Sequence, residues 1–169
     1  TKDIMDTPFS TTNYTEELLQ NQQARTLADV VVNDASVRMT TGSGGFDDPF
    51  QIRGFAVGSG DVGFNGIYGL ISSSRVPAQL LERVEVLKGP GAFLNGIPPG
   101  GTIGGSINVI TKRAGDVPLT RVTTTYQSQS NAGLQLDMGR RFGTDNEWGI
   151  RFNGQVRGGE ATIKGGRQD

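Results

Sequence analysis

Neither cysteine nor histidine occurs among the 169 residues of the sequence. Without cysteine the chain can form no disulfide, no thiolate nucleophile and no thiolate metal site, and it suits the cytosol as well as the periplasm. Without histidine it can hold no Ser-His-Asp triad, no histidine acid–base group and no histidine-ligated metal. The two absences together exclude a large part of ordinary enzyme chemistry.

Long apolar runs and a strong net charge are missing as well. No stretch of about 18 apolar residues occurs, so the sequence predicts no transmembrane helix, and a membrane role would require β-strands. Residues 1–6 lack the apolar segment of a secretory signal, so an exported protein would be represented here by a mature or trimmed form. A net charge of −1 without long Lys or Arg runs gives no indication of nucleic-acid binding.

Glycine, by contrast, is abundant, with 26 residues that cluster without any collagen-like period. Residues 89–105 alone hold seven glycines and three prolines. Such clusters predict tight turns and close backbone packing rather than long regular elements.

The first two thirds of the sequence predict short elements of both kinds. Helices are expected to begin at residues 15–19, where acidic residues occupy the first turn, and at Thr26, the N-cap, with Asp29 three residues later. Residues 1–14 are polar and expected to be extended or loose. Alternating or apolar runs predict strands at 50–55, 67–71, 83–88 and 106–111.

After Pro118 the pattern changes to alternation with period two, in segments 120–128, 133–142 and 148–157. One face of each segment is apolar and the other is polar or charged, and lengths of about 9–11 residues are typical of transmembrane barrel strands. A soluble meander with one solvated face would show the same alternation. Phe142 and Trp148 flank the short turn at 143–146, where an interfacial aromatic girdle would place them.

Two motifs look like catalytic or nucleotide sites but lack essential parts. The glycine spacing of 91–96 fits a phosphate-binding loop, yet Ile97 and Pro98 stand where Lys and Ser or Thr are needed. The start at 89–91 lacks the third glycine and the helix of a dinucleotide fingerprint. Glu82 and Glu85, three apart on a strand, should face opposite sides, which suits ion pairs better than shared acid–base chemistry.

Several segments in sequence order resemble the plug signature of TonB-dependent receptors. They read ERVEVLKGP at 82–90, GAFLNG at 91–96 and PGGTIGGSINVITKR at 99–113. IRGF at 52–55 is similar to a second plug motif, and VNDASVR at 32–38 resembles the siderophore-receptor form of the region before the first apical loop. The resemblance covers about residues 7–115.

The resemblance implies an α+β plug domain at 1–118, with a mixed β-sheet and short helices, followed at 119–169 by the first antiparallel strands of an incomplete 22-stranded transmembrane barrel. The plug would fill the barrel lumen in the outer membrane, and 143–146 would be a periplasmic turn. The implied function is binding of a ferric siderophore, or a similar metal chelate, and gating of its uptake, without enzymatic activity or a resident cofactor. The alternative is a soluble periplasmic plug-like binding or interaction module.

The implied partners are the chelate, the remainder of the barrel and TonB, which binds a short box by strand addition. Residues 1–6 do not resemble that box, so it is expected to have been removed or to lie upstream. No nucleic-acid partner is implied.

The resemblance also places candidate site residues. The apical loops would lie at 41–47, 57–65 and 72–76, and Arg75 would be the best contact for an anionic chelate. The candidate ligand residues there are Phe46, Asp61, Phe64, Ser72, Ser73 and Arg75.

A second candidate set would hold the plug to the barrel. Arg53 and Lys88 match the family's plug cations that pair with barrel glutamates. We expect these two to lack partners in this chain or to pair with Glu82 and Glu85, while Arg83 suits a plain structural ion pair.

Overall fold

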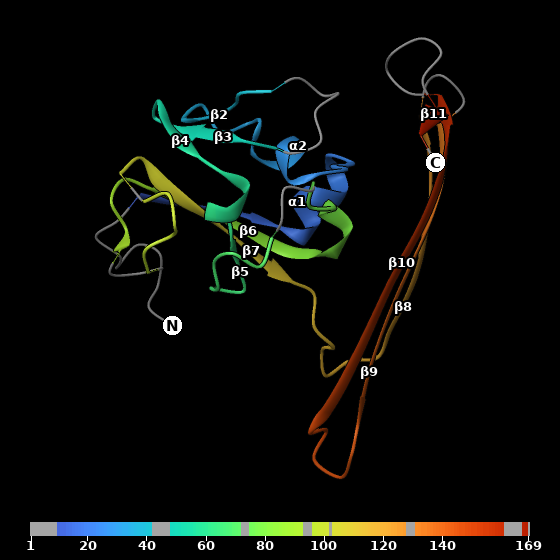
Figure 1. Ribbon diagram of the computed structural model, residues 1–169. Helices are drawn as coiled ribbons and strands as arrows, with labels where there is room; N and C mark the ends of the chain where they lie inside the picture. The colour runs from blue at the N-terminus through green and yellow to red at the C-terminus, as the bar shows by residue number, and fades with distance from the viewer. Residues whose placement is uncertain are drawn as a thin grey trace. The chain divides into compact units, whose positions relative to one another are not determined.

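The computed structural model describes residues 10–41, 48–71, 75–92, 96–101, 103–127, 131–160 and 167–168. The chain divides into two compact units, Thr1–Thr111 and Lys112–Asp169 (Figure 1). No helix in the described ranges is long and apolar enough to cross a membrane. The predicted domain boundary after residue 118 stays a prediction.

A four-stranded sheet forms the centre of the first unit, in the order β1-β6-β7-β5. β6 (Leu81–Lys88) pairs antiparallel with both β1 (Ser10–Thr15) and β7 (Gly105–Thr111), and the short β5 (Gly63–Phe64) runs parallel to β7. The predicted strands at 83–88 and 106–111 are confirmed. β1 was not predicted, because only Tyr14 of this polar edge strand is buried and the segment shows no apolar alternation.

A second, three-stranded sheet consists of β2 (Val37–Met39), β3 (Phe50–Ile52) and β4 (Phe55–Val57). The prediction of one strand over 50–55 is wrong, because Arg53 and Gly54 form a two-residue hairpin loop with φ of 52° and 87°. Two positive φ values define a type I′ turn, whose usual signal is Asn-Gly rather than Arg-Gly. The strand predicted at 67–71 is also wrong, since Ile67 makes only an isolated bridge to Phe64.

The described residues of this unit also form two short helices, α1 (Glu16–Asn21) and α2 (Leu27–Val31), and the 3₁₀ turns η2 (Ser59–Asp61) and η3 (Ala78–Leu80). Both predicted helix starts are confirmed. The Asp29 carboxylate accepts the backbone N–H of Thr26 at 3.0 Å, as a residue at the third helical position should. The mixed sheet with short helices is therefore the predicted fold of this region.

The apolar core of the first unit is built from side chains of the helices and of both sheets. Its members run from Tyr14 to Val109 and include Leu27, Val30, Phe50, Ile52, Val84, Val86 and Ile107, all nearly inaccessible to solvent. Every one of these core residues belongs to the first unit.

Residues 1–115 are therefore expected to fold without the strands that follow them. Circular dichroism should show ordered β-structure, and limited proteolysis should leave a resistant product, because the buried cluster is complete within this segment. A disordered peptide that is cleaved rapidly throughout would contradict a self-sufficient plug.

The second unit is an antiparallel sheet in the order β11-β10-β9-β8. Its strands are β8 (Leu119–Gln127), β9 (Asn131–Phe142), β10 (Trp148–Glu160) and β11 (Arg167–Gln168), and the three predicted alternating strands are confirmed. One face exposes large apolar side chains, among them Trp148, Ile150 and Val156, which are 72%, 64% and 74% accessible. The other face carries Asp137, paired with Lys112 at 3.3 Å and Arg151 at 2.5 Å.

Candidate functional site

A buried carboxylate, Asp34, joins three segments of the first unit. The Lys88 ammonium lies 3.0 Å from Asp34 Oδ2, and the Tyr14 hydroxyl donates to the same oxygen at 3.3 Å. The backbone N–H and hydroxyl of Ser36 donate to Oδ1 at 2.9 and 2.6 Å. Asp34 therefore connects the edge strand β1 and the end of β6 to the loop that precedes β2.

The charge states of this cluster follow from its contacts. Burial alone would raise the pKa of Asp34, but hydrogen bonds from Ser36 and Lys88 outweigh burial and lower the pKa from 3.8 to about 2. Burial, together with the charge of Asp34 and the hydrogen bond to it, raises the pKa of Tyr14 from 10.0 to about 12. At neutral pH the carboxylate is thus ionised and the phenol is a neutral donor.

Arg53 comes to the same place from the β3–β4 turn. Its backbone N–H donates to the Ser36 carbonyl at 2.8 Å, and its Nη1 would lie 3.9 Å from a Cβ built on Gly89, the residue after Lys88. The side chain is exposed and forms no ion pair or side-chain hydrogen bond within the part of the chain that the structure describes. The cluster thus holds two cations and one anion, and the excess charge belongs to Arg53.

The expectation that Lys88 lacks a partner or borrows a nearby glutamate is wrong, because Lys88 pairs with Asp34. Glu82 and Glu85 instead pair with Arg83 at 3.5 and 2.7 Å, and Glu85 also accepts a hydrogen bond from Asn108. The role of Asp34 could not be predicted from the sequence, because only the folded chain brings the loop before β2 to the end of β6.

Half of the candidate ligand residues, Phe46, Ser72 and Ser73, lie outside the described residues. The other three are engaged within the first unit. The Asp61 carboxylate accepts the N–H of Gly58 at 3.1 Å and of Gly100 at 2.6 Å, and so ties two glycine-rich loops together. Phe64 packs against the core, and Arg75 pairs with the buried Asp48 at 3.3 Å. Their roles as chelate contacts stay predictions.

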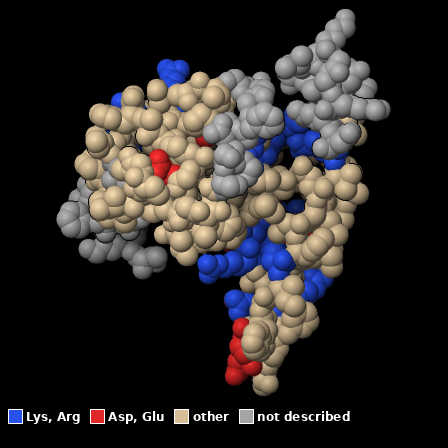
Figure 2. Space-filling view, in the orientation of Figure 1, with Lys and Arg blue, Asp and Glu red and all other residues tan. Residues whose placement is uncertain are grey.

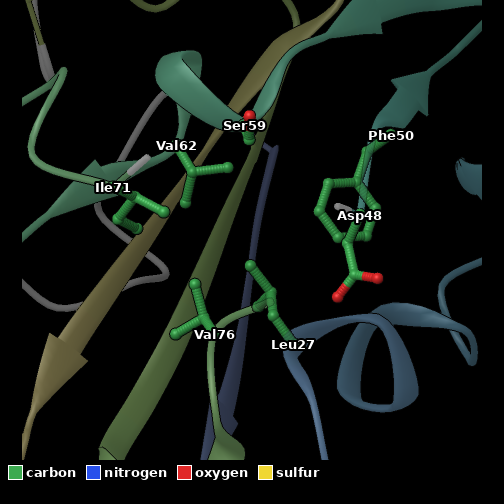
Figure 3. Close-up of a pocket in the computed structure, with 7 residues that line it drawn as sticks. All are labelled: Leu27, Asp48, Phe50, Ser59, Val62, Ile71 and Val76. Carbon is green, nitrogen blue, oxygen red and sulfur yellow. The ribbon is translucent and has the colours of Figure 1, made fainter. Parts of the chain in front are cut away.

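A small hollow lies beside Asp48, the carboxylate that pairs with Arg75 (Figure 3). The side chains that line it are mostly apolar: Leu27, Asp48, Phe50, Ser59, Val62, Ile71 and Val76. With one carboxylate that already pairs with Arg75, it offers few groups to a charged chelate, and we interpret it as an incompletely filled part of the core.

Comparison with known proteins gives one consistent family. The family model described as TonB-dependent Receptor Plug Domain matches residues 3–113. The ferrichrome receptor FcuA of Yersinia enterocolitica is 45% identical over 96% of this chain and 22% of its own length.

Solved structures agree with the sequence comparison. The crystal structure of BauA, the ferric preacinetobactin receptor of Acinetobacter baumannii, matches with a TM-score of 0.88 and 42% identity, over 96% of this chain and 24% of that protein. The siderophore receptor PiuA of the same organism matches with a TM-score of 0.78 and 26% identity, over 96% of this chain and 22% of that one. The chain spans between a fifth and a quarter of the length of these relatives.

Proposed function

Because the chain belongs to the TonB-dependent receptors, we propose that it is the N-terminal part of an outer-membrane transporter that captures a ferric siderophore and gates its uptake. The observation that carries this proposal is the order of the two units. A plug-like unit is followed directly by strands with one apolar, exposed face and one polar face, as the wall of a barrel around that plug requires.

The two units carry net charges of opposite sign. Residues 1–111 carry eleven acidic and seven basic side chains, whereas residues 112–169 carry six acidic and nine basic ones. Figure 2 shows several of the basic side chains on the surface of the second unit.

The ligand class follows from relatives with different named ligands. FcuA is named for ferrichrome and BauA for ferric preacinetobactin, so we propose a ferric chelate and leave its identity to the test. TonB would supply the energy for release, and the candidate contacts in the apical loops would include Phe46, Asp61, Phe64, Ser72, Ser73 and Arg75.

Binding by the purified complete receptor tests the ligand class. Tryptophan fluorescence would be followed during titration with ferrichrome, ferric preacinetobactin and cobalamin, since a vitamin B12 transporter is also among the relatives. Saturable binding of a ferric chelate supports the proposal. Binding of cobalamin alone would contradict it, and a receptor found in the soluble periplasmic fraction would favour the plug-like module instead.

Arg53 is our candidate for the residue that latches the plug to the barrel. A non-glycine residue with φ of 52° in a tight turn is held at a cost of about 1 kcal/mol, although glycine would adopt this conformation freely. A strained position is most easily explained when its side chain is needed. The exposed guanidinium, next to a cluster whose only described acid is already paired with Lys88, suits a carboxylate from the barrel wall.

The substitution Arg53→Gly distinguishes the effect of the strained backbone from the effect of the side chain in this latch. In isolated residues 1–115 it should raise the free energy of unfolding by about 1 kcal/mol, because the turn loses its strain. In the complete receptor it should loosen the plug, and cells should admit a bulky antibiotic that the outer membrane normally excludes. Arg38→Ala, which removes an exposed cation from the same small sheet, is the matched control and should leave the receptor sealed. A sealed Arg53→Gly receptor would rule out the latch.

A further inference from the structure

Arg140 interrupts the apolar face of the second unit. It lies on β9 between Met138 and Phe142, on the side of the sheet that also carries Leu134 and Leu136, and its register partner on β10 is Ile150. The proposed transport function uses the opposite, polar face of these strands. A guanidinium on the apolar side therefore has no role in that account.

The structure holds this guanidinium in a defined orientation. Nη1 donates to the carbonyl oxygens of Leu119 at 2.5 Å and Gly139 at 2.7 Å, and Nη2 donates to the Thr120 hydroxyl at 2.7 Å. These are its polar contacts within the described ranges of the chain. An arginine has five N–H donors, so Nε–H and one Nη2–H are left over by these contacts. When Thr120 accepts the Nη2–H that points away from Nε, the two remaining donors form the parallel fork that binds a phosphate or carboxylate bidentately.

Two of the carboxylates near this end of the sheet already have partners. Asp116 pairs with Arg141, whose side chain lies on the other face of β9, and Glu147 accepts the N–H of Asp145 within the turn. Figure 2 shows basic side chains along this end of the unit and acidic ones at its tip. None of the described carboxylates near this end, the turn residue Asp145 included, forms an ion pair with Arg140.

The position of Arg140 along the strand indicates which kind of anion it would meet. Arg140 is two residues from Phe142, which pairs with Trp148 at the last position before the turn, so the separation along the strand is about 7 Å. Aromatic residues at strand ends mark the level of lipid headgroups. The guanidinium therefore lies where the apolar interior of a bilayer meets its phosphates.

We propose that Arg140 and Thr120 form a phospholipid site on the outer surface of the barrel, in which the Nε–H and Nη2–H fork binds the phosphodiester of one lipid. Ile150 and Met138 contact the upper part of its acyl chains, and Trp148 lies at the headgroup level. The site serves to fix the height and rotation of these strands in the leaflet nearest the 143–146 turn. It rests on the proposed outer-membrane location but not on the identity of the chelate.

Native mass spectrometry of the detergent-purified complete receptor tests the site by counting bound lipid. The probes are dioleoylphosphatidylglycerol, dioleoylglycerol, which has the same chains without phosphate, and inorganic phosphate as competitor. Arg140→Gln should weaken binding of the tightest phosphatidylglycerol about tenfold, because it removes the charge and the fork. Arg140→Lys should weaken it several-fold, because a point charge replaces the fork.

The matched control is Arg121→Gln, which removes a cation at a similar height on the other face, opposite Asp137. It should retain the lipid, and a heat-shifted band on a gel should show that every variant contains a folded barrel. Equal lipid retention by Arg140→Gln, equal binding of dioleoylglycerol, displacement by millimolar inorganic phosphate, or loss of a receptor dimer instead of lipid would each overturn the proposal. No siderophore takes part in this experiment. Loss of the lipid site would therefore not contradict the proposed transport function, and a receptor that does not transport iron could still be tested for lipid binding.

Discussion

Gly105→Ala is expected to lower the free energy of unfolding of the plug by about 3–5 kcal/mol, a large part of the stability of a small domain. Gly105 begins β7 opposite Lys88 with φ of 142°, a conformation available almost only to glycine. A Cβ at this position would overlap the Leu87 carbonyl oxygen of the neighbouring strand and press on Ile52. The obstacle is a backbone atom within a sheet. The added methyl group can therefore be accommodated only if β6 and β7 separate at the Lys88–Gly105 register position.

Two other glycines isolate the cause of this loss. Gly101→Ala meets no atom within 4 Å but keeps a φ of 90°, so it should cost about 1 kcal/mol. Gly60→Ala meets neither obstacle and should change stability little. Urea denaturation of residues 1–115 gives all three values. If the Gly105→Ala plug were as stable as the Gly60→Ala plug, β6 and β7 could not approach each other as closely at Gly105 as the structure shows.

Asp34→Ala should destabilise the plug by a similar amount, about 3–5 kcal/mol, because it strands the largely buried Lys88 ammonium and removes the acceptor for Tyr14 and Ser36. Glu82→Ala removes a carboxylate from a half-exposed pair on the same domain and should cost less than about 1 kcal/mol. If the two substitutions had equal effects in denaturant, Asp34 would not be a structural centre of the plug.

The same cluster fixes how stability depends on pH. The pKa of Asp34 is lowered by folding, so its contribution is present above pH 3.8 and is lost as pH falls toward 2. The pKa of Tyr14 is raised by folding, so its contribution is present below pH 10 and is lost as pH rises toward 12. Tyr14→Phe should flatten the alkaline limb of the stability curve and leave the acid limb unchanged. An alkaline limb that Tyr14→Phe does not alter would contradict the assignment.

The regular parts of the fold could be read from the sequence because each carries a local signal. β6 and β7 contain β-branched apolar residues next to glycine, α2 has a capping residue, and β8–β10 alternate over nine or more residues. β1 has no such local signal. Its six residues are mostly polar, and the strand forms because it pairs with β6. The β3–β4 turn could not be predicted because Arg53 occupies the turn position at which Asn is the usual sequence signal.

The candidate site was predictable only in part. Motif resemblance singled out Arg53 and Lys88, and the structure brings both to one place. The partner of Lys88 could not be found in the same way, because Asp34 is distant in sequence and reaches β6 only through tertiary packing. For the apical candidates, sequence supplied loop positions but not contacts, and Asp61 already binds the backbone of two loops.

Uptake of ⁵⁵Fe by intact cells tests the proposed TonB-dependent transport of a ferric chelate. Iron-limited cells that carry the complete receptor as their only route for the chelate that binds best, starting with ferrichrome and ferric preacinetobactin, would be compared with cells that also lack TonB. We expect saturable accumulation of iron that disappears without TonB, while binding of the chelate at the cell surface persists. Accumulation that is equal with and without TonB, or no accumulation of any chelate that the receptor binds, would contradict the proposed transport.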